Sequence, residues 1–150
     1  MLIRELKIED MQRFIEIVKQ LSPESSLGVL PDRSAWYDLC RLQNKRVFVA
    51  ELDGKVVGTA SMLMEDKVNR GTNPKTNRFY CVAHIEEVVV DEEYRGKDVG
   101  LKLMEYCINY AKLAEAYKVI LDCDEEKNGE FYKKCGFRPT ERQFRMDLTP

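Results

Sequence analysis

Val88-Val89-Val90-Asp91-Glu92-Glu93-Tyr94-Arg95-Gly96-Lys97-Asp98-Val99-Gly100 is the stretch of sequence that decides the fold. Its valines predict the end of a buried strand, because a short β-branched run suits the interior of a sheet. Apolar residues then recur at helical spacing and predict a helix over residues 100–115. The first amides of a helix lack acceptors within it, and the helix dipole favours negative charge there. The stretch therefore predicts an anion site between a strand and a helix.

The loop between this strand and this helix carries groups that suit an anion. Gly96 and Gly100 let the backbone approach a ligand closely, and Arg95 and Lys97 add positive charge. The glycine spacing matches neither a Walker loop nor a dinucleotide fingerprint. From the loop residues alone, a strand-to-helix connection that binds no ligand is as good an interpretation as an anion site.

The elements on either side of this stretch alternate in type. Hydrophobic periodicity predicts strands at 2–6, 46–52, 55–64, 79–90, 117–123 and 137–148, and helices from 8, from 32, at 100–115 and at 129–135. Asp53-Gly54 is a strong hairpin-turn signal, and the polar residues 65–78 predict a long connection or flap. The order β-α-α-β-β-β-α-β-α-β predicts an α/β fold, with a mixed sheet covered by helices on both faces.

The length and charge of the chain limit the classes of protein to which it can belong. A chain of 150 residues, 44% hydrophobic and 33% charged, predicts a single globular domain over residues 1–150. A net charge of −2 argues against a general nucleic-acid binder. No apolar run approaches the ~20 residues of a membrane span, and the charged start of the chain does not resemble a signal peptide.

The cysteines and the single histidine narrow the chemistry further. Five cysteines form no Cys-x-x-Cys pair and mostly lie within apolar patterns, as a small hydrophobe does. A reduced compartment, the cytoplasm, therefore fits best. One histidine in the whole chain argues against a histidine-based zinc site or a Ser-His-Asp triad, and we expect no metal.

The loop and three other stretches resemble a known family. Arg95-Gly-Lys-Asp-Val-Gly100 resembles the pyrophosphate signature Gln/Arg-x-x-Gly-x-Gly/Ala of the GNAT acetyltransferase superfamily. Residues 84–90, 117–124 and 128–137, which read HIEEVVV, YKVILDCD and NGEFYKKCGF, are similar to eukaryotic glucosamine 6-phosphate N-acetyltransferases. The resemblance is close from His84 to Phe137. It implies a GNAT fold with a mostly antiparallel sheet, acetyl-CoA as cosubstrate, and a homodimer that acetylates the amine of glucosamine 6-phosphate.

The resemblance also assigns roles on the cofactor side of the site. The backbone of Val88, Val89 and Val90 would pair with the pantetheine arm. The pyrophosphate would lie against Arg95, Gly96, Lys97, Asp98, Val99 and Gly100, and Asn128 would contact the cofactor. Tyr132 would protonate the departing thiolate, a task that suits a phenol. The alternative is a tyrosine that only packs a short helix.

Acidic residues at neighbouring strand ends are the candidates for the acceptor side. Glu86, Glu87, Asp122 and Asp124 suit an ammonium-bearing sugar, and the Asp122 carbonyl would orient its nitrogen. A solvated acidic rim is the alternative. Cys123 and Arg145 complete the expected substrate contacts, while Lys67, Arg70, Lys75 and Arg78 offer cations for a phosphate. A lone histidine in a strand is more often structural, so His84 receives no role.

Direct transfer in a ternary complex is the expected mechanism. No basic partner stands beside Cys123 or Cys135 in the sequence to activate an acetyl-cysteine intermediate. Acetylation of another small amine, such as a polyamine or amino acid, and a non-catalytic CoA-binding module are the alternatives. Retention of Tyr132 favours an enzyme, because a sensor has no need of the acid.

The sequence departs from the family pattern at three positions. Asp98 replaces a consensus glycine, Glu86-Glu87 stands where Glu-Asp is common, and Asp147 stands in place of an arginine that Arg145 could replace. We expect the Asp98 side chain to turn away from the pyrophosphate and to cap the following helix.

Overall fold

The computed structural model describes residues 1–21, 34 and 44–140, and five strands in them form one sheet. The strands lie in the order β1-β2-β3-β4-β5: β1 (Leu2–Glu5), β2 (Lys45–Leu52), β3 (Lys55–Asp66), β4 (Cys81–Val90) and β5 (Lys118–Leu121). Neighbouring strands are antiparallel except β4 and β5, which are parallel. The predicted mixed, mostly antiparallel sheet is confirmed.

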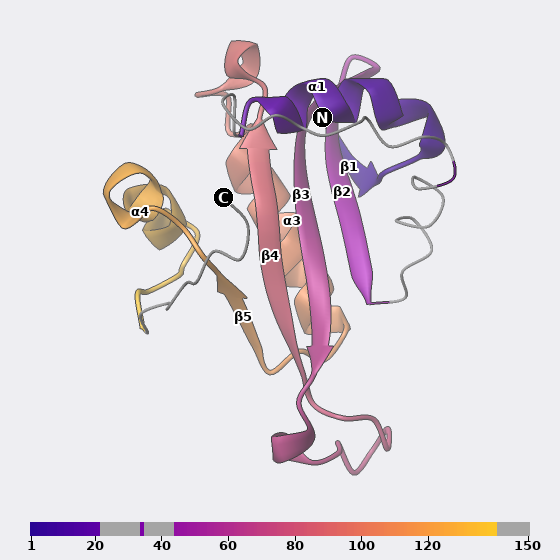
Figure 1. The fold of residues 1–150 in the computed structure, drawn as a ribbon. Coiled ribbons are helices and arrows are strands. Elements are labelled where there is room, and N and C mark those ends of the chain that lie inside the picture. The colour runs from indigo at the N-terminus through magenta and orange to yellow at the C-terminus, as the bar shows by residue number, and fades with distance from the viewer. Residues whose placement is uncertain (22–33, 35–43, 141–150) are drawn as a thin grey trace, which may run out of the picture.

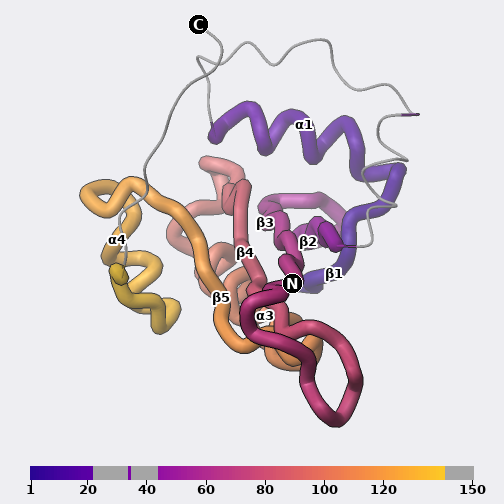
Figure 2. Tube along the Cα trace, turned by 60° about the horizontal axis from the view of Figure 1, so that its bottom comes forward, coloured from indigo at the N-terminus to yellow at the C-terminus, as the bar shows by residue number. Residues whose placement is uncertain are grey.

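Helices lie on both faces of this sheet, as predicted. The described helices are α1 (Met11–Lys19), α3 (Val99–Leu113) and α4 (Glu125–Lys134), with 3-10 turns η1 (Ile8–Asp10), η2 (Val68–Arg70) and η3 (Glu92–Tyr94). Helix α1 crosses one face near the end of β4, and α3 runs behind the other face (Figures 1 and 2). Helix α4 follows β5 at the sheet edge (Figure 1). The helix expected from residue 32 lies outside the described residues, apart from Ser34, which is helical. Residues 141–148 of the expected closing strand also lie outside them. Residues 137–140, the start of that expected strand, are not in a strand.

The turn between β2 and β3 has the geometry that its sequence predicts. Asp53 and Gly54 both have positive φ angles, 50° and 77°, and Leu52 pairs with Lys55. Two consecutive left-handed residues suit the right-handed twist of a two-residue hairpin. This turn sets the register of the first two pairs of β2 and β3, and a bulge between Ala50 and Glu51 shifts the register beyond them.

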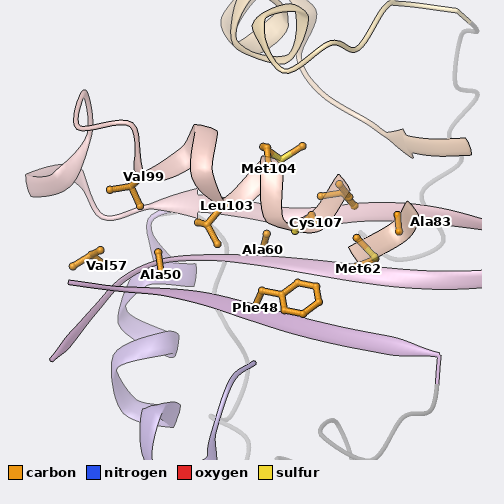
Figure 3. Packing of buried hydrophobic residues seen from close by; sticks show 12 residues of the cluster. Phe48, Ala50, Val57, Ala60, Met62, Ala83, Val99, Leu103, Met104 and Cys107 are labelled. Carbon is orange, nitrogen blue, oxygen red and sulfur yellow. The ribbon is translucent and has the colours of Figure 1, made fainter. Parts of the chain in front are cut away.

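Alternate residues of the central strands build two separate cores. Phe48 and Met62 pack with Leu103 and Met104 between the sheet and α3 (Figure 3). On the other face, Val49 packs with Ile17, Val56 and Val89 beneath α1. Successive strand side chains point to opposite faces, so adjacent Phe48 and Val49 serve different cores. The two helices are thereby held on opposite sides of β4.

Several element boundaries differ from those that the periodicity predicts. Helix α4 begins at Glu125 rather than at 129, because Asp124 Oδ1 accepts from the amides of Glu126 and Lys127 at 3.1 and 3.3 Å. Strand β4 begins at Cys81 rather than at 79. Strand β5 ends at Leu121 rather than at 123, and this early end opens the site.

Candidate active site

A bulge interrupts β4 at the acidic pair. Thr59 lies opposite Val89 and Ser61 opposite Glu86, so two β4 residues, Glu87 and Val88, face the single Ala60. Glu87 has a left-handed φ of 51°. Such a bulge bends the strand and redirects its side chains, and left-handed backbone at a non-glycine residue is often found at functional sites.

Beyond the bulge, β4 and β5 part from each other. Their last pair is Ile85 with Leu121, whereas β4 continues to Val90. The edge of residues 86–90 that faces β5 is therefore not paired with it. The side chains of Val88 and Val90 pack on the α3 core and Val89 is buried beneath α1, so only their backbone is offered to a ligand.

A cleft of about 1000 Å³ lies where the two strands part. The end of β4, the loop into α3, the first turn of α3, the residues after β5 and one side of α4 line it. It brings together the expected site residues Glu86, Glu87, Val88, Val89, Val90, Arg95, Gly96, Asp98, Val99, Gly100, Asp122, Cys123, Asn128 and Tyr132. Lys97 is the described exception: its ammonium donates to the Glu93 carbonyl at 3.1 Å and lies 4.9 Å from the Tyr94 ring centroid. Arg145 lies outside the described residues.

The conformation of Asp98 corrects the expected cap. Asp98 is the N-cap residue of α3, but its φ of 57° and ψ of 11° are left-handed, and within the described chain its side chain makes no capping hydrogen bond. Capping side chains reach the first-turn amides from an extended N-cap backbone. The left-handed turn of Asp98 instead leaves these amides open to an anion.

Gly100 allows α4 to approach the start of α3. A Cβ atom at Gly100 would lie 3.1 Å from Cζ and 3.3 Å from Cε2 of Phe131. The missing side chain therefore lets the Phe131 ring pack against the first turn of α3. This contact holds the two helices that border the cleft.

Helix α1 anchors the corner where β4 enters the loop. Asp91, only 4% exposed, pairs with the Arg13 guanidinium and accepts from the Glu93 amide at 3.2 Å. Arg13 Nε also donates to the Val56 carbonyl at 3.0 Å. Sequence reasoning missed this anchor, because Arg13 and Asp91 lie 78 positions apart and no local pattern joins them.

Tyr132, the expected proton donor, packs between two aromatic rings. Its half-buried ring lies 5.1 Å from that of Phe131 and 6.2 Å from that of Phe137, between centroids. Burial raises the pKa of its phenol, and nearby Cys123 and Cys135 raise this pKa further. The hydroxyl therefore stays protonated at neutral pH, as a general acid requires.

Cys123 is poorly suited to be a nucleophile. Burial raises the pKa of its thiol, and the charges of Glu125, Asp124 and Asp122 raise it further. The thiolate is the reactive form of cysteine, and burial with nearby negative charge disfavours its formation here. The electrostatics support direct transfer over an acetyl-cysteine intermediate.

The acidic residues share one face of the sheet with a histidine. Glu87 Oε2 accepts from the Ser61 hydroxyl at 2.5 Å and lies 3.5 Å from Lys45 Nζ. His84 Nε2 lies 3.4 Å from Asp122 Oδ2, and Nδ1 lies 3.8 Å from Glu86 Oε1. The structure thus places His84, which received no role from its sequence, in the acidic cluster. The sequence feature that could have pointed to His84 is its position two residues before Glu86, which puts both side chains on the same face of the strand.

The flap cations do not act as one group. Lys67 Nζ lies 2.5 Å from Glu65 Oε2, and Arg70 stacks 4.9 Å above the Tyr117 ring centroid. Their flap joins β3 to β4 at the end of the sheet away from α1 and α4 (Figure 1). The pKa of Glu65 is lowered mainly by Lys67 and to a lesser extent by His84.

Among residues 1–21, 34 and 44–140, no helix is long and apolar enough to cross a membrane. In the same residues, no group of three or more His, Cys, Asp or Glu side chains is arranged to hold a metal ion.

The fold and the cleft define a domain of the acetyltransferase class that the loop signature implied. The sequence profile of the acetyltransferase (GNAT) family matches residues 11–137, which is most of the chain. The chain therefore belongs to the acetyltransferase (GNAT) family.

Individual relatives are similar over much of their length. A glucosamine 6-phosphate N-acetyltransferase of Trypanosoma brucei brucei is 42% identical over 69% of this chain and 65% of its own length. The enzyme of that name from Arabidopsis thaliana is 35% identical over 89% of this chain and 87% of its own. The crystal structure of the Arabidopsis thaliana enzyme superposes with a TM-score of 0.82 at 32% identity, covering 99% of this chain and 98% of that one.

Proposed function

We propose that this chain transfers the acetyl group of acetyl-CoA to the amine of D-glucosamine 6-phosphate, giving N-acetyl-D-glucosamine 6-phosphate. The observation that carries the proposal is the cleft between β4 and β5, which joins an open helix N-terminus to an acidic cluster. The relatives named for this reaction support the choice of substrate.

The cofactor side of the cleft fits a coenzyme A thioester. Open first-turn amides of α3, together with Gly96 and Gly100, suit the pyrophosphate, and the unpaired edge of residues 86–90 suits the amide groups of pantetheine. Arg95 donates to the Val90 carbonyl at 3.1 Å and so ties the loop to this edge. Acetyl-CoA supplies the activated acetyl group.

The acceptor side fits an amino sugar. The Glu86, Glu87 and Asp122 carboxylates favour an ammonium group and can accept from sugar hydroxyls. The amine must lose a proton before it attacks; one of these carboxylates accepts it through water, and the Asp122 carbonyl is available to orient the nitrogen. Attack on the thioester carbon then breaks the bond to sulfur, and Tyr132 donates the proton that the leaving thiolate needs.

Thiol release tests the proposal directly. The pure protein, incubated with acetyl-CoA, should release free thiol with glucosamine 6-phosphate in preference to polyamines and amino acids. Release with one of those amines instead would favour another acceptor for the same cleft. Binding of acetyl-CoA without release by any amine would favour a non-catalytic module.

The phosphate of the acceptor requires cations, and the flap residues Lys67, Arg70, Lys75 and Arg78 are the candidates from the sequence. We expect free glucosamine to be a poorer substrate than its 6-phosphate, because the phosphate adds charge-assisted hydrogen bonds. Equal thiol release from both sugars would remove the phosphate from the proposal.

The proposed enzyme is a cytoplasmic homodimer made of one domain per chain, residues 1–150. The net charge of −2 and the free cysteines of the described residues support the cytoplasmic location. Alternation of Phe144 and Met146 with Arg145 and Asp147 supports a closing strand that pairs across a two-fold axis, with Arg145 serving the substrate.

A further inference from the structure

His84 occupies the corner at which β4 and β5 part. It pairs with Leu63 of β3 on one side and with Ile120 of β5 on the other, one residue before the last β4–β5 pair. Side chains alternate along a strand, so Glu86 and Asp122, each two residues beyond this row, stand on the same face as His84. The imidazole therefore lies between the carboxylates that border the acceptor side of the cleft.

Each ring nitrogen of His84 lies within ion-pair distance of a carboxylate. Nε2 lies 3.4 Å from Asp122 Oδ2 and Nδ1 lies 3.8 Å from Glu86 Oε1, with the side chain only 19% exposed. The other charged groups on this face are Glu65 with its partner Lys67, from β3 and the flap, and the ion pair of Lys45 with Glu87, from β2 and β4. Two carboxylates thus face the imidazole directly, and each nearby lysine has a carboxylate of its own.

We infer that His84 is a positioning residue that holds the Asp122 and Glu86 carboxylates in place for the acceptor amine, an inference that rests on the proposed function. Carboxylates only accept hydrogen bonds, an imidazolium has two N–H donors, and a neutral imidazole has one. The protonated ring can therefore hold both carboxylates, and the neutral ring only one. A ring without its charge would therefore leave one of the two carboxylates without a donor, and the test below varies pH for this reason.

The test compares the wild type with His84→Gln and His84→Arg between pH 6 and 8.5. At pH 6, His84→Gln should raise the KM for glucosamine 6-phosphate roughly threefold to tenfold, as loss of a charged hydrogen bond predicts. The ratio of this KM to that of the wild type should fall as pH rises. His84→Arg, which keeps its donors at every pH, should keep KM near the wild-type pH 6 value. Ionisation of the substrate is common to all three proteins and cancels in the ratios.

A double variant tests whether His84 acts through Asp122. Asp122→Asn keeps the main-chain carbonyl but removes the charge, so His84→Gln should change KM much less in this background. The dissociation constant for acetyl-CoA and the melting temperature should stay near wild type in every variant. Additive effects, a KM ratio near one at pH 6, or a parallel loss of acetyl-CoA binding would overturn the positioning role. Absence of thiol release by the wild type would instead overturn the substrate, and the role with it.

Discussion

At the scale of single residues, the hydroxyl of Tyr132 carries the proposed acid chemistry. Its pKa is raised by burial, so it remains a donor across neutral pH. Tyr132→Phe should lower kcat by ~10²-fold with little change in the dissociation constant for acetyl-CoA. Tyr106→Phe is the matched control, because its ring packs on Phe48 and its hydroxyl lies outside the described cleft lining. An unchanged kcat in Tyr132→Phe would mean that the thiolate leaves without this acid.

Asp98 illustrates how backbone conformation reverses an expectation. A capping role would make Asp98→Gly destabilising, but the left-handed φ of 57° favours glycine. We expect Asp98→Gly to keep or slightly raise the melting temperature. It should also lower the dissociation constant for acetyl-CoA several-fold, because a carboxylate near the pyrophosphate is removed.

Asp53→Gly is the matched control for this prediction. Asp53 has nearly the same backbone, with φ of 50°, but lies in the β2–β3 turn. Thermal melts should respond alike in the two variants, whereas calorimetric titration with acetyl-CoA should respond only in Asp98→Gly. Weaker binding by Asp98→Gly would show that the carboxylate organises the loop.

At the scale of elements, the contact of α3 with α4 shapes the cleft. Gly100→Ala places a methyl group 3.1 Å from Phe131 Cζ, so the ring must move by a few tenths of an ångström. We expect weaker acetyl-CoA binding, by a few-fold, although alanine favours the helix by about 1 kcal/mol. In the control Gly129→Ala, the new methyl group meets only the Glu125 side chain, which can move, so binding should persist. Equal binding by both variants would mean that α4 adapts without cost.

The N-terminal elements depend on a partly buried ionic network that predicts acid sensitivity. Arg4 donates to both Asp10 oxygens at 2.6 and 2.9 Å and to Glu51 Oε2 at 2.8 Å, joining β1, η1 and β2. The hydrogen bond from Arg4 is the main cause that lowers the pKa of Asp10 below its ordinary value. A lowered pKa in the folded state adds stability above the unfolded pKa of about 3.9, and this stability is lost as pH falls through the folded pKa.

Asp10→Asn tests this network. It should lower the free energy of unfolding by about 1–3 kcal/mol at pH 7, as loss of charged hydrogen bonds predicts, and by much less near pH 2. Denaturant melts at both pH values measure the difference. The exposed Arg13–Glu16 pair is the control, since Glu16→Gln should change stability by less than about 1 kcal/mol. A deficit of Asp10→Asn that persists unchanged at pH 2 would assign the loss to packing.

At the scale of the whole molecule, assembly and substrate binding are expected to be linked. Light scattering should give the mass of a dimer, and an Arg145→Ala dimer should have a raised KM for glucosamine 6-phosphate, by roughly tenfold. Arg142→Ala, on the other face of the expected strand, should keep the wild-type KM. A monomeric mass would rule out the shared site, whereas a wild-type KM for the Arg145→Ala dimer would remove only the substrate role.

Local patterns in the sequence were enough to predict the order of the strands and helices that the structure describes. Asp53-Gly54 demands a tight hairpin, and the helical spacing from Leu103 to Ala111 demands an amphipathic helix, whatever surrounds them. The same holds for the anion site, because Gly96 and the free amides of a helix start are properties of one short segment. Family membership followed from these residues and from the stretches that flank them.

Contacts between distant residues decided the rest, since no local period encodes them. The partnership of Arg13 with Asp91, the setting of His84 between Glu86 and Asp122, and the early end of β5 all require the folded sheet. The left-handed backbone of Asp98 is likewise imposed by the connection from β4 to α3, because a residue with a side chain favours a right-handed or extended backbone. The sequence by itself determined the fold and predicted an anion site; tertiary packing decided which carboxylates face the cleft, because it alone brings separate strands to one corner.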